Sequence, residues 1–200
     1  MRMTEIRIAG FGGQGVILSA TIIGKAASIY ENGYATMTQS FGPEARAGSS
    51  SAQVIISDAP ILYPYVTRPD VLVVMSQEAY TRFTPELKPG GVLLIESEMV
   101  RVSELSSGVR CYGVPATRLA EELGRKMVLN VVMVGFYGAV IGAPGAAALR
   151  EAVADSVPPG MQKLNLDAFD KGFSYGKSLV ASLSRGDDAD SFEAVLEQED

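Results

Sequence analysis

The stretch IRIAGFGGQG, residues 6–15, joins the alternating pattern of a strand to a glycine-rich turn. The segment that follows, residues 16–31, has apolar residues at helical spacing, and Asn32 with Gly33 marks its end. YATMTQS, residues 34–40, then has the pattern of a second strand. The first forty residues therefore predict a strand, a glycine turn, a helix and a strand, which is typical of an α/β fold.

The rest of the chain continues to alternate between strand and helix patterns. Strands are predicted at 51–58, 68–75, 92–97 and 108–115, and helices at 76–83, 116–124, 130–142, 145–156 and 165–183. We therefore predict a three-layer α/β/α sandwich, Rossmann-like, around a mostly parallel or mixed sheet. The short connection at 41–50 permits an antiparallel pair, because a parallel crossover usually needs a dozen residues or more. Residues 1–183 are expected to form one domain and the acidic residues 184–200 a flexible tail.

Composition excludes several classes of protein. A net charge of -6 without any basic block argues against nucleic-acid binding. The chain has one cysteine and no histidine, which leaves no histidine-based catalytic site, no zinc site with several thiolate ligands and no cysteine-ligated cluster, and we expect no metal site. No apolar run reaches the roughly 18 residues of a membrane span. We expect a cytoplasmic protein with no catalytic residue of its own, and Cys111 as a small buried side chain.

The glycine turn is the first candidate site. Gly10, Gly12 and Gly15 have the G-x-G-x-x-G spacing of a dinucleotide-binding turn. That fingerprint needs an acidic residue after the second strand, where this chain has Thr38–Ser40, and no Gly-Lys-Ser/Thr follows to make a P-loop. Gly13 and Gln14 make the turn richer in glycine and amides than a turn requires. It is expected to meet an anion or another polypeptide, or else only to pack strand against helix.

TQSFGPEARAG, residues 38–48, is the second candidate site. It gathers hydroxyl, carboxamide, carboxylate and guanidinium groups on a loop at a strand end, where α/β sheets place binding groups. Arg46 suits a phosphate or carboxylate because its guanidinium is a planar fork. The alternative is a solvated loop in which Glu44 and Arg46 are ordinary surface charges. A further choice concerns the apolar helix 130–142, which completes either this chain's own core or an interface.

Taken together, GFGGQG, QSFGPEARAG and the strand end SD resemble the gamma subunit or gamma domain of the 2-oxoacid:ferredoxin oxidoreductases. The resemblance covers about residues 4–180 and implies the fold of the gamma domain, domain III, of pyruvate:ferredoxin oxidoreductase. The loop looks most like the 2-oxoglutarate and branched-chain members, but has Phe41 for their usual Tyr and Ala47 for their usual Gly. Substrate expectations therefore run from 2-oxoglutarate, the favoured one, to branched-chain 2-oxoacids and indolepyruvate.

The resemblance implies a subunit of an enzyme that converts a 2-oxoacid and CoA to acyl-CoA, CO2 and reduced ferredoxin. Thiamine diphosphate with Mg and the 4Fe-4S clusters would lie on alpha, beta and, where present, delta subunits, and ferredoxin would bind the complex. This chain would form a non-catalytic wall that helps to bind CoA and to hold the catalytic subunits. The alternatives are a free-standing nucleotide-binding module and a structural adaptor.

The resemblance also implies roles for particular residues. Cofactor binding, to CoA or to a partner loop, would fall to Gly10, Gly12, Gly13, Gln14 and Gly15. The subunit interface or active-site wall would be formed by Ser40, Gly42, Pro43, Glu44 and Arg46.

Overall fold

The computed structural model describes residues 3–41, 49–103 and 105–185. Its strands are β1 (Met3–Phe11), β2 (Tyr34–Phe41), β3 (Ser49–Ser57), β4 (Val71–Val74), β5 (Val92–Glu96) and β6 (Arg110–Val114). Its α-helices are α1 (Val16–Lys25), α2 (Gln77–Phe83), α3 (Ala116–Glu121), α4 (Leu129–Ile141), α5 (Ala146–Ser156) and α6 (Gln162–Arg185). Short helical turns are η1 (Ala26–Tyr30), η2 (Thr84–Glu86), η3 (Lys126–Val128) and η4 (Pro159–Met161). Each predicted strand and helix is thus present, with boundaries shifted by a few residues.

The described strands form one mixed sheet in the order β2-β3-β1-β4-β5-β6. β1, β4, β5 and β6 are parallel neighbours, whereas β3 runs antiparallel to both β1 and β2. The prediction of a mostly parallel or mixed sheet is confirmed. The antiparallel pair of β2 and β3 lies where the connection is too short for a parallel crossover.

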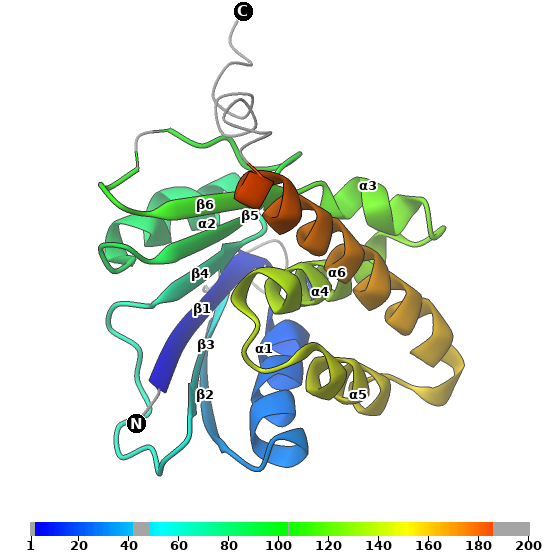
Figure 1. The fold of residues 1–200 in the computed structure, drawn as a ribbon, viewed down its shortest axis with the longest axis horizontal. Coiled ribbons are helices and arrows are strands. Elements are labelled where there is room, and N and C mark those ends of the chain that lie inside the picture. The colour runs from blue at the N-terminus through cyan, green and yellow to red at the C-terminus, as the bar shows by residue number, and fades with distance from the viewer. Residues whose placement is uncertain (1–2, 42–48, 104, 186–200) are drawn as a thin grey trace, which may run out of the picture.

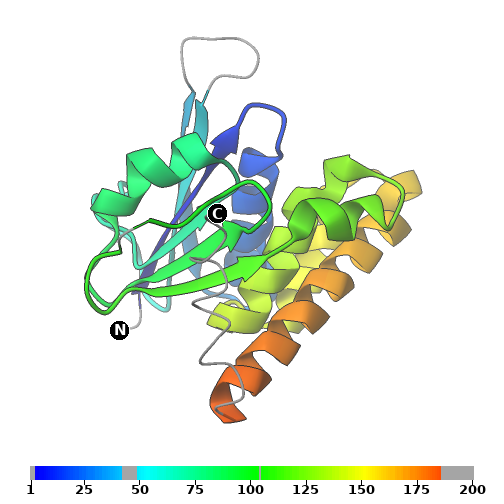
Figure 2. The same ribbon diagram turned by 90° about the horizontal axis from the view of Figure 1, so that it is seen from above.

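Helices cover both faces of the sheet, as predicted for a three-layer sandwich (Figures 1 and 2). One face shares a core with α1, α3, α4 and α6, and α5 packs on the outer side of α1 and α4. The other face of β4 and β5 packs against α2 and the segment that leads to β6. Buried side chains on both faces explain why β4, with the sequence VLVV, is apolar throughout.

Local chemistry sets where the first helices begin and end. Ser76 caps α2, since its Oγ accepts a hydrogen bond from the backbone N–H of Ala79 at 3.2 Å. α1 continues into a π-helical turn, and the chain reverses at Asn32, whose φ is 56°. The helix stop expected at Asn32 and Gly33 is therefore confirmed.

The apolar helix α4 is buried within this chain, from Leu129 to Gly138. It packs closely against α6. This is possible because residue 172 of α6 is glycine, since a Cβ on Gly172 would overlap the carbonyl oxygen of Val132. Of the two alternatives for this helix, the structure supports the central helix of the chain's own core. No partner is required to cover its buried part.

Among the described residues, no helix combines the length and the apolar character that a membrane crossing requires. α6 extends to Arg185, two residues beyond the end expected from the sequence. Most of the predicted acidic tail lies outside the described residues. The division into a domain at 1–183 and a tail stays a prediction.

Candidate functional site

The carboxyl ends of β1, β4, β5 and β6 lie at one edge of the sheet. The end of β2 and the start of β3 lie at the same edge, because β3 is antiparallel to its neighbours. Figure 2 shows the glycine turn that follows β1 beside the ends of β2 and β3. In open α/β sheets this is the edge at which ligands bind.

Gln14 in the glycine turn is directed into the chain. Its Oε1 accepts a hydrogen bond from the backbone N–H of Phe11 at 2.6 Å. Its Nε2 donates to the carbonyl oxygen of Met75, just beyond β4, at 2.9 Å, and lies 3.6 Å from the sulfur of Met99. The carboxamide therefore fastens the turn to the neighbouring strand, and its polar atoms are used within the chain.

Two of the glycines are explained by close packing. A Cβ on Gly10 would lie 2.5 Å from Oε1 of Gln14. Gly15 precedes α1 with a φ of 75°, and a Cβ there would lie 2.5 Å from Cγ of Asn130. The Asn130 side chain instead donates to the carbonyl oxygen of Gly15 at 3.3 Å. Close packing, against Gln14 of the turn and against Asn130 of α4, thus accounts for the first and last glycines of the motif.

Gly12 and Gly13 form the exposed part of the turn. Gly13 has a φ of 95°, and a Cβ there would meet no atom within 4 Å. The helix α1 behind them has no side-chain cap and no acidic residue in its first turn. Its first N–H groups and the positive end of its dipole favour an anion, so this surface has the chemistry to bind a phosphate.

The sheet order weakens the dinucleotide interpretation further. In that fingerprint the second strand lies next to the first, and its end carries the acid that holds the ribose. Here β3 lies between β1 and β2. The end of β2 is therefore two strand spacings, roughly 10 Å, from the turn, and no acid stands at Thr38, Gln39 or Ser40.

Of the second candidate site, residues 38–48, the structure describes only residues 38–41. Ser40 is exposed near the end of β2 and pairs with Ser51 of β3, which in turn pairs with Ala9. Ser49, at the start of β3, accepts a hydrogen bond from Arg82 of α2 at 3.2 Å. The remaining predicted residues, Gly42, Pro43, Glu44 and Arg46, lie outside the described residues. Ser40 and the glycine turn thus share one edge of the sheet, separated by a single strand.

Glu96 and Asn130 were not singled out from the sequence. Glu96 is wholly buried at the end of β5, and its carboxylate accepts hydrogen bonds of 3.0 Å from the N–H groups of Glu98 and Thr117. Burial raises the pKa of the Glu96 carboxyl, although hydrogen bonds from the backbone of Thr117 and Met99 oppose the rise. The sequence signal for Glu96 was a carboxylate at the end of an apolar strand, and that for Asn130 was a polar residue inside an apolar run.

Cys111 of β6 has intermediate exposure and packs against the core on the α2 face. Burial raises the pKa of its thiol to about 12, so the reactive thiolate is rare at neutral pH. The described residues include no group of three or more Cys, Asp or Glu side chains placed to hold a metal ion. Among the described residues, this edge therefore offers exposed backbone amides, serine hydroxyls and the guanidinium of Arg82.

Comparison with known proteins gives a consistent family. The model of the family described as pyruvate ferredoxin/flavodoxin oxidoreductase matches residues 5–175. 2-Oxoglutarate synthase subunit KorC of Methanothermobacter thermautotrophicus is 49% identical over 187 residues, 90% of this chain and 97% of the relative. The same subunit of Methanocaldococcus jannaschii is 44% identical over 177 residues, 88% of this chain and 95% of the relative.

Two solved structures extend the likeness to the fold. The gamma subunit of a keto/oxoacid ferredoxin oxidoreductase from Geobacter sulfurreducens matches with a TM-score of 0.78 and 37% identity, over 88% of this chain and 99% of that one. A 2-oxoglutarate:ferredoxin oxidoreductase from Magnetococcus marinus, with 2-oxoglutarate, coenzyme A and succinyl-CoA bound, matches with a TM-score of 0.80 and 26% identity. That match covers 89% of this chain and 32% of the longer one.

Proposed function

Because the chain belongs to the pyruvate ferredoxin/flavodoxin oxidoreductase family, we propose that it is the gamma subunit of a 2-oxoglutarate:ferredoxin oxidoreductase. The observation that carries this proposal is identity of 44% and 49%, over nearly full length, to two 2-oxoglutarate synthase subunits. The complex would convert 2-oxoglutarate and CoA to succinyl-CoA and CO2 and pass two electrons to ferredoxin. Branched-chain 2-oxoacids and indolepyruvate are the alternative substrates.

The residues of this chain do not suit the redox cofactors of such a complex. A 4Fe-4S cluster needs several thiolates, and the chain has one cysteine, whose pKa is raised by burial. We therefore assign the clusters and thiamine diphosphate with its Mg to alpha, beta or delta subunits. A cytoplasmic location agrees with this assignment, because free thiols persist in a reducing compartment.

CoA is the one cofactor that the described residues suit. Its phosphates match the exposed amides at Gly12 and Gly13 and the uncapped start of α1. Gln14, Gly10 and Gly15 would act indirectly, since their contacts hold the turn in shape. A relative with a similar fold binds coenzyme A, which supports this proposal.

The gamma subunit would form a wall of the active site and supply no catalytic group. CoA phosphates held at the glycine turn would leave the thiol end free to reach an acyl group on a partner subunit. Ser40 and the loop at 42–48 follow the same edge of the sheet, so this loop would face the catalytic subunits.

The test is purification of the tagged chain from its native cells without oxygen. We expect partner subunits, iron and thiamine diphosphate to copurify, and a viologen dye to be reduced only with both CoA and 2-oxoglutarate. The rate with 2-oxoglutarate should exceed that with branched-chain 2-oxoacids or indolepyruvate at least tenfold. A chain that purifies alone, without iron or thiamine, would overturn the proposal in favour of a separate nucleotide-binding module or adaptor.

A further inference from the structure

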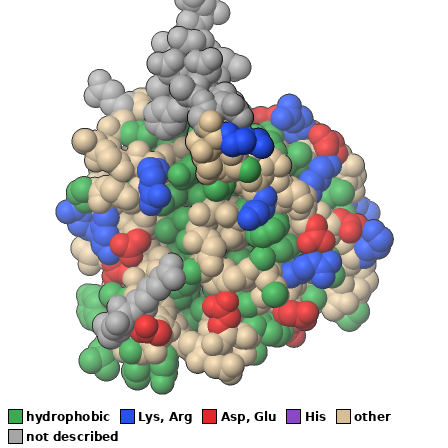
Figure 3. Space-filling view, in the orientation of Figure 1, with side chains coloured by type: hydrophobic (Ala, Val, Ile, Leu, Met, Phe, Trp, Pro, Cys, Tyr) green, Lys and Arg blue, Asp and Glu red, His purple; other side chains and the backbone are tan. Residues whose placement is uncertain are grey.

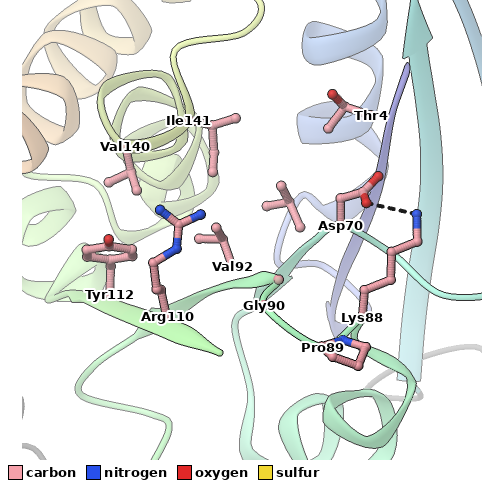
Figure 4. A pocket seen from close by; sticks show the side chains of 12 residues that line it. Thr4, Asp70, Lys88, Pro89, Gly90, Val92, Arg110, Tyr112, Val140 and Ile141 are labelled. Carbon is pink, nitrogen blue, oxygen red and sulfur yellow. Dashed lines mark hydrogen bonds and ion pairs between the residues drawn. The ribbon is translucent and has the colours of Figure 1, made fainter. Parts of the chain in front are cut away.

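A cavity lies at the opposite edge of the sheet from the glycine turn, where β4, β5 and β6 begin. It has a volume of about 370 Å³, and Figure 4 shows how its walls differ in character. Val92, Val140 and Ile141 give it an apolar side, and Asp70, Lys88 and Arg110 give it a charged side. We name it the α4 cleft, because Val140 and Ile141 are the last residues of that helix.

The two cations of the α4 cleft, Lys88 and Arg110, differ in whether they are paired with carboxylates. Nζ of Lys88 lies 2.8 Å from Asp70 and 2.6 Å from Glu5, so it forms ion pairs with two carboxylates. The Arg110 side chain is exposed, and no described residue accepts a hydrogen bond or forms an ion pair with its guanidinium. In Figure 4 this guanidinium is turned towards Val140, away from the Asp70–Lys88 pair. The cleft therefore offers one free cation beside an apolar wall.

The end of α6 lies close to this cleft. α6 runs alongside α4 in the same direction, with Gly172 against Val132 and Gly176 against Ala139. It therefore ends, at Arg185, on the side of the molecule where α4 ends, as both views of the fold show (Figures 1 and 2). Fifteen further residues follow Arg185, and an extended chain of that length spans up to about 50 Å. Residues 186–200 are therefore long enough to contact the cleft.

The sequence of residues 186–200 offers carboxylates for Arg110 and apolar side chains for the apolar wall of the cleft. It contains seven Asp or Glu residues and no Lys or Arg. Phe192, Val195 and Leu196 follow the i, i+3, i+4 spacing that places apolar side chains on one face of a helix. Carboxylates flank these apolar residues, as Arg110 flanks the apolar wall of the cleft.

We propose that residues 186–200 dock on the α4 cleft of their own chain, with a carboxylate at Arg110 and the apolar residues against Val92, Val140 and Ile141. Attachment to α6 favours this contact, because a short tether gives an effective concentration in the millimolar range. Only one arginine takes part, so the docked form needs the apolar contact as well as the charge. Added salt should weaken only the ionic contact with Arg110 and leave the apolar contact in place.

Hydrogen exchange of the full chain tests this proposal against a chain that ends at Arg185. Every described helix and strand lies within residues 3–185, so the shorter chain retains them all. A docked form favoured by about 3 to 1 slows the exchange of the amides it covers roughly fourfold. We expect residues 110–112 and 138–142 to exchange about that much faster in the shorter chain. Addition of the free 186–200 peptide should restore slow exchange.

A pair of charge reversals separates docking from a general effect of charge. Arg110→Glu in the full chain should raise exchange at the α4 cleft as truncation does. Arg101→Glu makes the same change in charge next to Gln77, at the start of α2, and should leave the cleft unchanged. Equal exchange in the full and shortened chains would overturn the proposal, and so would an equal response to both reversals. Protection that arises only when other subunits are added would assign the cleft to a partner.

Discussion

At the scale of single residues, the glycine turn divides into buried and exposed parts. Gly10 and Gly15 are small because Gln14 and Asn130 occupy the space beside them. The Gln14 carboxamide, which the sequence suggested as a group for an anion or another polypeptide, is bonded to Phe11 and Met75. In the proposed CoA site, contact with a phosphate would therefore fall to the backbone of Gly12 and Gly13, and a substitution there would act through charge and backbone shape.

A matched pair at Gly13 tests that role in the assembled enzyme. Its positive φ strains most side chains, but Asn and Asp tolerate such conformations better than others, and the space around it is open. Gly13→Asp should raise the KM for CoA about tenfold relative to Gly13→Asn, because one more negative charge then lies near a phosphate, a cost of about 1.4 kcal/mol. The KM for 2-oxoglutarate should be equal in the two variants. Equal KM values for CoA would show that CoA phosphates bind elsewhere.

At the scale of elements, the contact between α4 and α6 depends on glycines in both helices. A Cβ on Gly172 would overlap the backbone of Val132, and one on Gly135 would overlap the backbone of Phe169. These contacts join backbone to backbone, so no side chain can rotate away to make room. The sequence showed glycines within two helical patterns but gave no sign that they face one another.

Gly172→Ala should therefore destabilise the chain although alanine favours helix formation. Separation of two packed helices to admit one methyl group costs about 3 kcal/mol or more, against a gain of about 1 kcal/mol in helix propensity. Denaturant unfolding at constant pH measures the difference. Gly160→Ala is the control, since a Cβ there meets no atom within 4 Å and should change stability by less than about 1 kcal/mol. Similar stabilities for the two variants would contradict the described helix contact.

At the scale of the whole molecule, Arg7 links three segments that are far apart in the sequence. It lies on β1 with 4% of its surface exposed. Its guanidinium donates to the Val66 carbonyl oxygen at 3.2 Å, forms an ion pair with Glu86, and lies 4.8 Å from the centre of the Phe83 ring. The sheet, the segment before β4 and the end of α2 are held together at this side chain.

Arg7→Met should retain the apolar packing on Phe83 and remove the donor to Val66. We expect a loss of about 2 kcal/mol in the free energy of unfolding, because a buried carbonyl oxygen then lacks its hydrogen bond. Glu86→Gln removes only the partner carboxylate, whose side chain is 42% exposed, and should cost less than about 1 kcal/mol. Thermal and denaturant unfolding compare the two variants. A larger loss for Glu86→Gln would assign the stabilisation to the ion pair.

The sequence by itself determined the order of strands and helices and the turn after β1, and it permitted the antiparallel pair of β2 and β3. These features depend on apolar periodicity, glycine and connection length, all of which are local in the chain. The tertiary structure alone decided that β3 separates β1 from β2, that Gln14 bonds inward to Met75, and that Asn130 lies beside Gly15. These depend on contacts between residues up to 115 positions apart, which local patterns cannot specify. The glycine motif was therefore visible from the sequence, whereas its division into tightly packed glycines and exposed ones required the packed molecule.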